Sequence, residues 1–285
     1  TAKVSGFAPH ARVIHIDIDP AEIGKNVAVD VPIVGDVKIV LEELNKLVSD
    51  KQHLDWFNQL DTWRKEHPAL DIRTGDGLRP QSVVRGIYEK THGEAVIVTG
   101  VGQHQMWAAQ HYYYDKPNTL ISSGGLGTMG YGLPASIGAK IACPDKTVWC
   151  IDGDGSFQMN IQELATVVQE KVGVKIAILN NGYLGMVRQW QDLFYEKRYV
   201  ATPLSGPDFV KIAEAYGIPA LRVKRDEEIG PAIEQAMAED GPFLLDFLVE
   251  PEENVYPMVA PGESLSETIE APKKEEAVWQ QPSTP

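Results

Sequence analysis

The chain has 285 residues and a formal net charge of −14 at pH 7, with 40 acidic against 26 basic side chains. This charge disfavours nucleic acid and anionic membranes as partners, and no apolar run approaches the roughly 20 residues that span a bilayer. The two cysteines, Cys143 and Cys150, form no metal-ligand pattern and no disulfide framework, so we expect a reducing compartment. Because Thr1 is not an initiator residue, we expect a fragment or a processed product.

Residues 1–49 have the pattern of the end of an α/β domain. Apolar residues alternate from Arg12 to Ile18, and a second short strand is expected from Val31 to Val34. Asp36 then precedes an amphipathic stretch and is expected to cap its helix. Two neighbouring strand ends bearing Asp17 and Asp36 are suited to hold ribose or ribityl hydroxyls. The alternative is that both are ordinary solvated turn acids.

Residues 50–79 read as a linker that contains one amphipathic helix, and a regular alternation of strands and helices begins at residue 80. Six strands alternating with helices predict an α/β fold with a doubly wound, mostly parallel sheet over residues 80–260. The tail, 261–285, is rich in proline and glutamate and is expected to be mobile. The expected strands are Ala95–Thr99, Thr119–Ser122, Thr147–Ile151, Val174–Leu179, Ala220–Val223 and Phe243–Val249.

The most informative stretch runs from Thr147 to Val187 and reads as strand, glycine turn, helix, strand and loop. The helix is expected over Asn160–Glu170, so the two strands must be parallel neighbours whose carboxyl ends share one sheet edge. Asp154 and Asn181 then lie together although 27 residues separate them. A carboxylate and an amide oxygen beside a glycine turn suit Mg²⁺ carrying a diphosphate. The alternative is a plain β-turn followed by an unrelated polar loop.

A competing motif is Gly125-x-Gly127-x-x-Gly130, which matches the dinucleotide-binding fingerprint. It follows a strand and opens a helix, and Asp152 lies about 20 residues further on, as a ribose-binding acid should. However, Met129 places a bulky side chain where a pyrophosphate must approach closely. The dinucleotide interpretation also leaves Asp154 and Asn181 without a role.

Gly153-Asp154-Gly155, 24 intervening residues and Asn180-Asn181 resemble the signature of thiamine diphosphate (ThDP) enzymes. Beyond the signature, the chain resembles the large catalytic subunit of acetohydroxyacid synthase (acetolactate synthase) from about residue 12 to residue 258. The resemblance covers the end of that family's central FAD-binding domain and its whole C-terminal ThDP-binding domain. The stretches that carry it are His15–Asn26, Val101–Trp107, Gly125–Leu133, Gly153–Leu164 and Leu179–Trp190.

The resemblance implies roles for individual residues. Asp154, Asn181 and the backbone carbonyl of Tyr183 would bind Mg²⁺, and Trp190 would favour 2-ketobutyrate over pyruvate as the second substrate. Met129 would be the apolar wedge that holds ThDP bent. The implied ThDP-binding residues are Gln103, His104, Gly127, Thr128, Met129, Asp154, Gly155, Ser156, Asn181 and Met186. The implied contacts to a structural FAD are Asp17, Ile18, Asp36 and Val37.

The implied reaction is a carboligation in branched-chain amino acid biosynthesis. Pyruvate is decarboxylated, and the two-carbon unit joins pyruvate or 2-ketobutyrate to give 2-acetolactate or 2-aceto-2-hydroxybutyrate. The resemblance implies that a glutamate from the pyrimidine-binding domain of a neighbouring subunit is needed, so we assign no proton-transfer residue. We expect this chain alone to bind ThDP–Mg²⁺ weakly at best and to form no acetolactate.

The implied partners are copies of the same chain, as a homodimer or tetramer, and a separate regulatory subunit. The implied location is the bacterial cytoplasm or the plastid stroma. Two alternatives remain open. One is another ThDP enzyme, such as a 2-ketoacid decarboxylase, glyoxylate carboligase or pyruvate oxidase, and the other is a dinucleotide-binding module.

Overall fold

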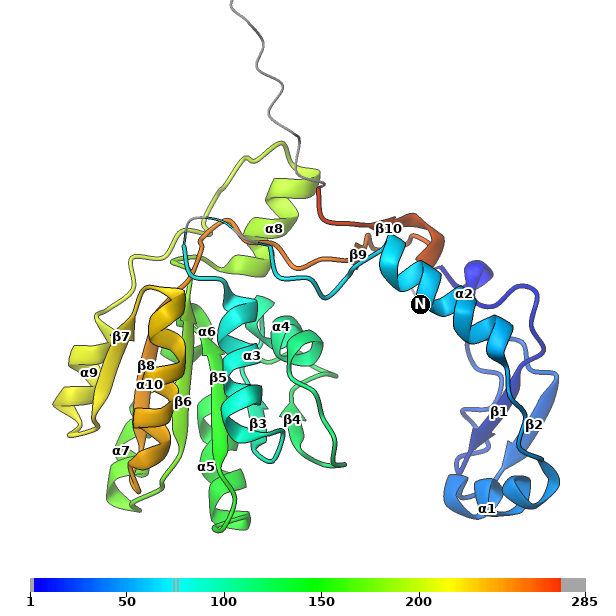
Figure 1. Cartoon of the computed structure of the whole chain (residues 1–285), viewed down its shortest axis with the longest axis horizontal. Helices are drawn as coiled ribbons and strands as arrows, with labels where there is room; N and C mark the ends of the chain where they lie inside the picture. The colour runs from blue at the N-terminus through cyan, green and yellow to red at the C-terminus, as the bar shows by residue number, and fades with distance from the viewer. Residues whose placement is uncertain (1–2, 74, 76, 273–285) are drawn as a thin grey trace, which may run out of the picture. The chain divides into compact units, whose positions relative to one another are not determined.

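The computed structural model describes residues 3–73, 75 and 77–272, and these fall into two compact units. The first unit consists of described residues 3–69 and 256–272, and the second is Leu70–Val255. Figure 1 shows the elements of both units, coloured along the chain. Among the described residues, no helix combines the length and the apolar character needed to cross a bilayer.

The first unit contains the two strands expected near the N-terminus. They pair in parallel, with Ile14 opposite Val31 and Asp17 opposite Val34. Asp36 caps the next helix as predicted, because its Oδ1 accepts from the backbone amides of Lys38 (2.8 Å) and Ile39 (3.3 Å). None of the described residues of this unit is buried. Its elements are η1 (Val4–Gly6), β1 (Ile14–Asp17), β2 (Val31–Val34), α1 (Val37–Leu47), α2 (Leu54–Glu66), β9 (Met258–Val259), η3 (Leu265–Glu267) and β10 (Thr268–Ile269).

The stretch expected to be a mobile tail is described only in part. Residues 265–269 form η3 and β10, and β10 pairs with β9 in an antiparallel ladder. The remainder, residues 273–285, lies outside the described residues.

The second unit is built on the predicted six-stranded sheet, and every strand pairing in it is parallel. The strand order β4-β3-β5-β6-β8-β7 makes β5 and β6 direct neighbours in the middle of the sheet. All residues of β3 and β5 are buried, as expected for strands covered by helices on both faces. The strands are β3 (Val96–Thr99), β4 (Leu120–Ser122), β5 (Val148–Gly153), β6 (Lys175–Asn180), β7 (Ala220–Val223) and β8 (Phe243–Leu248).

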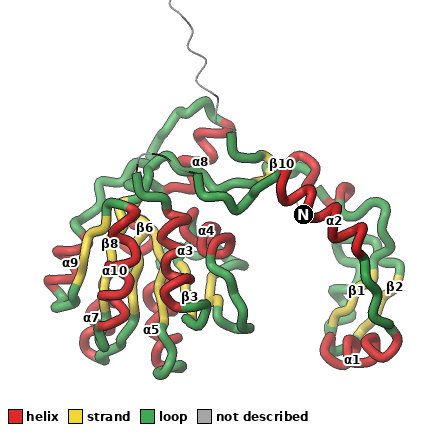
Figure 2. The backbone as a smooth tube through the Cα atoms, in the orientation of Figure 1, coloured by secondary structure: helices red, strands yellow, loops and turns green. Residues whose placement is uncertain are grey.

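Two hydrophobic cores cover the two faces of this sheet. Along β5, Trp149 and Ile151 enter one core, and Val148 and Cys150 enter the other. Helices α3, α4 and α10 contribute to the first core, and α5, α6, α7 and α9 contribute to the second. Figure 2 shows helices flanking the yellow strands of this sheet. The bounds are α3 (Pro80–Thr91), α4 (Gln103–His111), α5 (Gly132–Ala142), α6 (Asp154–Gln158), η2 (Ile161–Glu163), α7 (Leu164–Gln169), α8 (Gly185–Phe194), α9 (Phe209–Ala215) and α10 (Asp226–Ala238).

Local structure differs from the expectation around the central stretch. Strand β5 runs through to Gly153 and α6 begins at Asp154, so Gly153-Asp154-Gly155 is a strand-to-helix junction. The single helix expected over Asn160–Glu170 is a short 3-10 turn followed by α7. The expected loop after β6 turns into α8, whose buried side chains are Arg188 and Gln189. Sequence patterns assign apolar residues to buried positions, so the polar pair Arg188 and Gln189 gave no sign of the side that α8 buries.

Candidate functional site

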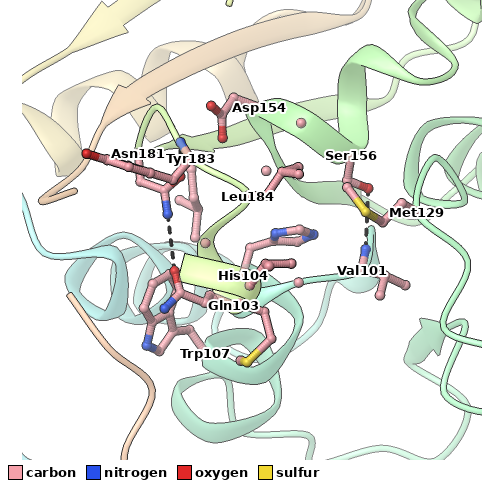
Figure 3. A pocket seen from close by; sticks show the side chains of 17 residues that line it. Val101, Gln103, His104, Trp107, Met129, Asp154, Ser156, Asn181, Tyr183 and Leu184 are labelled. Carbon is pink, nitrogen blue, oxygen red and sulfur yellow. Dashed lines mark hydrogen bonds between the residues drawn. The ribbon is translucent and has the colours of Figure 1, made fainter. Parts of the chain in front are cut away.

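The candidate site is a cavity at the carboxyl edge of the sheet, where β3, β5 and β6 end. The cavity is partly open to solvent. Figure 3 shows the side chains that line it. This edge is where open parallel sheets bind ligands. The lining residues are Val101, Gly102, Gln103, His104, Trp107, Met129, Gly153, Asp154, Gly155, Ser156, Leu179, Asn181, Tyr183, Leu184, Gly185, Met186 and Val187.

Asp154 is a buried carboxylate at the first position of α6, and its side chain is only 3% exposed. Its Oδ2 has no hydrogen-bond partner among the described residues. Burial raises the pKa of Asp154 to about 6, although the backbone amides of Gly155 and Gly182 and the nearby His104 ring lower it. The carboxylate therefore faces the loop after β6 and lacks a full set of partners for its charge.

Asn181 lines the same cavity as Asp154, as the shared-edge argument predicts. Gly153 of β5 pairs with Leu179 of β6, so the two functional side chains follow neighbouring strand ends. Asn181 Oδ1 accepts from the backbone amide of Tyr183 (3.0 Å), and Gly182 between them has a positive φ of 69°. Tyr183 also lines the cavity, so the three proposed Mg²⁺ ligands converge on one place.

Ser156 lines the cavity but is engaged by the protein itself. Its side chain is 1% exposed, and its Oγ accepts from the backbone amides of Gly130 (3.1 Å) and Val101 (3.4 Å). Figure 3 shows the bond to Val101. The hydroxyl thus joins the loops after β3 and β4 to α6, and only its own proton is left to donate. The backbone at Gly155 is closely covered, because a Cβ there would lie 2.9 Å from side-chain atoms of Leu184 and Leu204.

Gln103 and His104 begin α4 and are both buried. Gln103 Oε1 accepts from Asn181 Nδ2 (3.1 Å), which links α4 to the loop after β6 (Figure 3). His104 Nε2 lies 3.3 Å from Oδ1 of Asp152, a residue with 0% exposure. The dinucleotide interpretation assigned Asp152 to a ribose, and its complete burial beneath His104 contradicts that assignment.

The residues expected around the thiamine core divide into two groups. Met129 and Met186 line the cavity, whereas Gly127, Thr128 and Trp190 are not among its lining residues. The Thr128 amide donates to Ser123 Oγ (3.1 Å), which holds the loop before α5. Trp190 is partly buried on α8 and packs edge-on against Phe194, with 5.6 Å between ring centroids.

The proposed FAD contacts lie in the first unit. Asp17 ends β1 and Asp36 follows β2, so both acids stand at the carboxyl end of the same parallel pair. Asp17 Oδ1 accepts from the backbone amide of Asp19 (2.9 Å), and Asp36 is committed to capping α1. Ile18 and Val37 are 71% and 55% exposed and free of the core, as contacts to a ligand require.

Sequence reasoning missed two features of the site. Gln189 of α8 hydrogen-bonds Gln103 at the cavity wall, and its position three residues after Met186 carries no motif that signals this contact. Leu184 covers the backbone of Gly155, and the only available signal was its position in the loop after Asn181. Groups of three or more His, Cys, Asp or Glu that could hold a metal ion do not occur among the described residues.

Residues 100–247 match the C-terminal TPP binding domain of thiamine pyrophosphate enzymes, and residues 1–44 match the central domain of the same enzymes. The acetolactate synthase large subunit of Mycobacterium tuberculosis is 51% identical over 280 residues, which cover 94% of this chain and 45% of that protein. The acetolactate synthase large subunit of Corynebacterium glutamicum is 48% identical over 279 residues, which cover 94% of this chain and 45% of that protein. Acetolactate synthase 1, chloroplastic, of Oryza sativa is 47% identical over 283 residues, which cover 94% of this chain and 44% of that protein.

The chain thus spans less than half the length of the curated relatives it matches. The match to the C-terminal domain covers just over half of the chain and includes the cavity with Asp154 and Asn181. The chain therefore belongs to the thiamine pyrophosphate enzymes, with their C-terminal cofactor-binding domain and the end of their central domain, and it is a homologue of acetolactate synthase large subunits.

Proposed function

We propose that the second unit carries the Mg²⁺–ThDP half of an acetolactate synthase active site. The observation that carries this proposal is the Asp154 carboxylate, which is buried, lacks a partner at Oδ2 and has a pKa raised by burial. A buried anion without a countercharge is costly, and a divalent cation in the cavity would remove that cost. Asn181 and Tyr183 line the same cavity and would supply the other two protein oxygens.

The remaining lining residues fit the rest of the cofactor. Gln103, His104, Gly155 and Ser156 surround the end of the cavity at α4 and α6, where the diphosphate would be held. Met129 and Met186 supply the apolar lining for the thiamine core, with Gly127 and Thr128 beside Met129. When bound, ThDP supplies the carbon nucleophile and the electron sink for decarboxylating a 2-ketoacid. Trp107 and Leu184 line the same cavity and would exclude water from the bound cofactor.

We infer the wider assembly from the relatives. The substrates would be pyruvate and a second 2-ketoacid, with Trp190 selecting the second one. FAD would bind at Asp17, Ile18, Asp36 and Val37 as a structural cofactor.

Active sites would form between copies in a homodimer or tetramer. A separate regulatory subunit would bind, in line with the name "large subunit" that bacterial relatives carry. The expected location is the cytoplasm or the plastid stroma, where Cys143 and Cys150 stay reduced.

A titration of the full chain with ThDP tests the cofactor assignment. We expect binding that requires Mg²⁺, and we expect Asp154→Ala to abolish the Mg²⁺ requirement together with most of the affinity, because it removes the one buried carboxylate of the set. Calorimetry with and without EDTA measures this directly. Asp145→Ala is the matched control, because Asp145 is exposed and lies outside the cavity. Metal-independent binding, or a preference for NAD over ThDP, would contradict the proposal.

A further inference from the structure

Three side-chain carboxamides form a continuous hydrogen-bonded chain beside the candidate site. Gln189 of α8 bonds Gln103 of α4, and Gln103 bonds Asn181 in the loop after β6. All three residues are buried, with exposures of 0%, 2% and 8%. We call Gln189, Gln103 and Asn181 the amide relay. A carboxamide has an oxygen that accepts and a nitrogen that donates, so each bond in the relay fixes which way the next amide faces.

The far end of the relay is set by backbone groups that cannot reverse their roles. The Val255 amide donates to Gln189 Oε1 (2.8 Å), and Gln189 Nε2 donates to the Val255 carbonyl (2.9 Å). A backbone N–H always donates and a backbone carbonyl always accepts. These two bonds therefore allow only one orientation of the Gln189 amide.

The fixed orientation of the Gln189 amide in turn fixes the orientation of the Gln103 amide. Its Nε2 donates to Gln189 Oε1 (2.8 Å) and to the Glu253 carbonyl (3.1 Å), so both of its N–H groups are used. The Gln103 oxygen must then face the other way, toward Asn181 Nδ2 (3.1 Å), as Figure 3 shows. Reversing the Gln103 amide would set an oxygen against two acceptors, at the cost of two buried hydrogen bonds.

Asn181 is the last member of the relay. Its nitrogen is turned to Gln103, so its oxygen faces the Tyr183 amide, from which it accepts at 3.0 Å. A carbonyl oxygen has a second lone pair, which stays available on the cavity side for a cation. If the amide were reversed, an NH₂ group would meet the Tyr183 N–H and would offer no oxygen to a metal.

The segment that sets the relay is itself firmly held. The buried Glu253 carboxylate accepts from Arg79 (2.5 Å), Arg73 (3.1 Å) and Gln81 (3.0 Å). Arg188 of α8 donates to the Glu253 carbonyl (3.1 Å) and to Asn254 Oδ1 (2.6 Å). The backbone groups at residues 253–255 are thus fixed from two sides, and the relay has a rigid starting point.

We propose that Gln189 and Gln103 are positioning residues that keep the Asn181 oxygen directed at the metal. This inference rests on the proposed function, in which Asn181 is a Mg²⁺ ligand. Residues that orient a metal ligand without touching the metal change metal affinity by about 10- to 100-fold when they are replaced. Gln189 is not among the lining residues of the cavity, so an effect of its replacement on metal affinity must act through Gln103 and Asn181.

The first test is the Mg²⁺ concentration that half-saturates ThDP binding to the full chain. Gln189→Met keeps the length of the side chain but removes both polar atoms, and we expect the half-saturating concentration to rise about tenfold or more. Gln169→Met is the matched control, because Gln169 is exposed and bonds only its neighbour Glu170 among the described contacts.

A double-mutant cycle separates orientation from general damage. In Asn181→Asp both terminal atoms at position 181 are oxygens, so no orientation has to be imposed. The Gln103 oxygen then faces an acceptor instead of Asn181 Nδ2, so we expect Gln189→Met not to raise the half-saturating Mg²⁺ concentration in this background. An equal loss in both backgrounds would overturn the proposal and assign Gln189 a purely structural role.

A second measurement needs no cofactor. In ¹⁵N-labelled chain, exchange of the Asn181 and Gln103 side-chain NH₂ protons should be slow, and Gln189→Met should accelerate it while the backbone amides of β5 and β6 stay protected. Unchanged side-chain exchange would overturn the relay, whatever the chain binds. Failure of the wild-type chain to bind ThDP with Mg²⁺ would instead contradict the proposed function, and this exchange measurement would still decide the relay.

Discussion

At the scale of single residues, burial shifts two titratable groups of the second unit in opposite directions. Burial raises the pKa of Asp154 to about 6, and burial together with the nearby Arg85 lowers the pKa of His111 to about 4. His111 is 3% exposed and lies at the end of α4, on the helix that Gln103 begins. Both groups are therefore held in their neutral forms at pH values where the unfolded chain would charge them.

The two shifts predict opposing effects on stability between pH 4 and pH 6. Because its pKa is raised, Asp154 contributes a stability that is fully present below pH 3.8 and is lost as the pH rises through about 6. The lowered pKa of His111 contributes stability that is complete above 6.5 and is lost as the pH falls through about 4. A shift of about two pH units corresponds to roughly 3 kcal/mol, so the two effects largely cancel in the wild type.

Replacing either residue alone should therefore change how the free energy of unfolding depends on pH, because the two opposing effects no longer cancel. From pH 4 to pH 6 in metal-free buffer, we expect the free energy of unfolding of Asp154→Asn to rise more steeply with pH than that of the wild type. For His111→Gln we expect it to rise less steeply or to fall. Urea unfolding followed by circular dichroism measures both slopes, and parallel pH profiles for the three proteins would contradict this account.

At the scale of elements, the site depends on close packing between the ends of β3, β5 and α5. A Cβ added at Gly100 would lie 1.8 Å from Asp152 Oδ1, and one at Gly132 would lie 2.7 Å from the Gly100 backbone nitrogen. Asp152 fills the space that these two glycines leave, and His104 lies over it. The glycines thus let a buried carboxylate and a buried imidazole support the floor of the cavity.

Two glycine-to-alanine substitutions should have opposite effects on stability. Gly100→Ala should lower the free energy of unfolding by about 1–3 kcal/mol, because the added methyl group overpacks a buried site. Gly138→Ala should raise it by about 0.5–1 kcal/mol, because Gly138 lies exposed inside α5 and alanine is the better helix former. Urea midpoints of the two variants and the wild type provide the measurement. An unchanged urea midpoint for Gly100→Ala would contradict this account, because it would mean that the loop after β3 moves to make room for the methyl group at little cost.

At the scale of the whole molecule, the two units differ in how much they bury. The second unit has a core on each face of its sheet, whereas none of the described residues of the first unit is buried. The relatives are more than twice as long as this chain. The proposed site supplies metal ligands and the lining around the cofactor, but no residue of this chain is assigned to proton transfer. We therefore propose that catalysis also needs a proton-transfer group that none of the described residues supplies.

Assays of product formation test that proposal. The purified chain of 285 residues, given pyruvate, ThDP, Mg²⁺ and FAD, is expected to form no acetolactate. Acetoin released after acid treatment reports the product, and detectable turnover would overturn the expectation. Acetaldehyde or acetate as the main product would favour another ThDP enzyme.

The sequence by itself determined the strands, the parallel sheet and the common edge shared by Asp154 and Asn181. These follow from local patterns, since a buried strand is a short apolar run, and a strand–helix–strand unit can close only in parallel. The same local logic placed Asp36 as a helix cap, which the structure confirms.

Only the tertiary structure decided the strand order, the existence of α4 and α8, the burial of Asp152 and the amide relay. Each of these depends on contacts between residues far apart in the chain, such as Gln103 with Gln189 and Gln189 with Val255. Helices α4 and α8 bury polar side chains, among them Gln103 and Gln189, whereas sequence patterns assign apolar residues to buried positions. The raised pKa of Asp154 is likewise a property of the folded chain, because burial causes it.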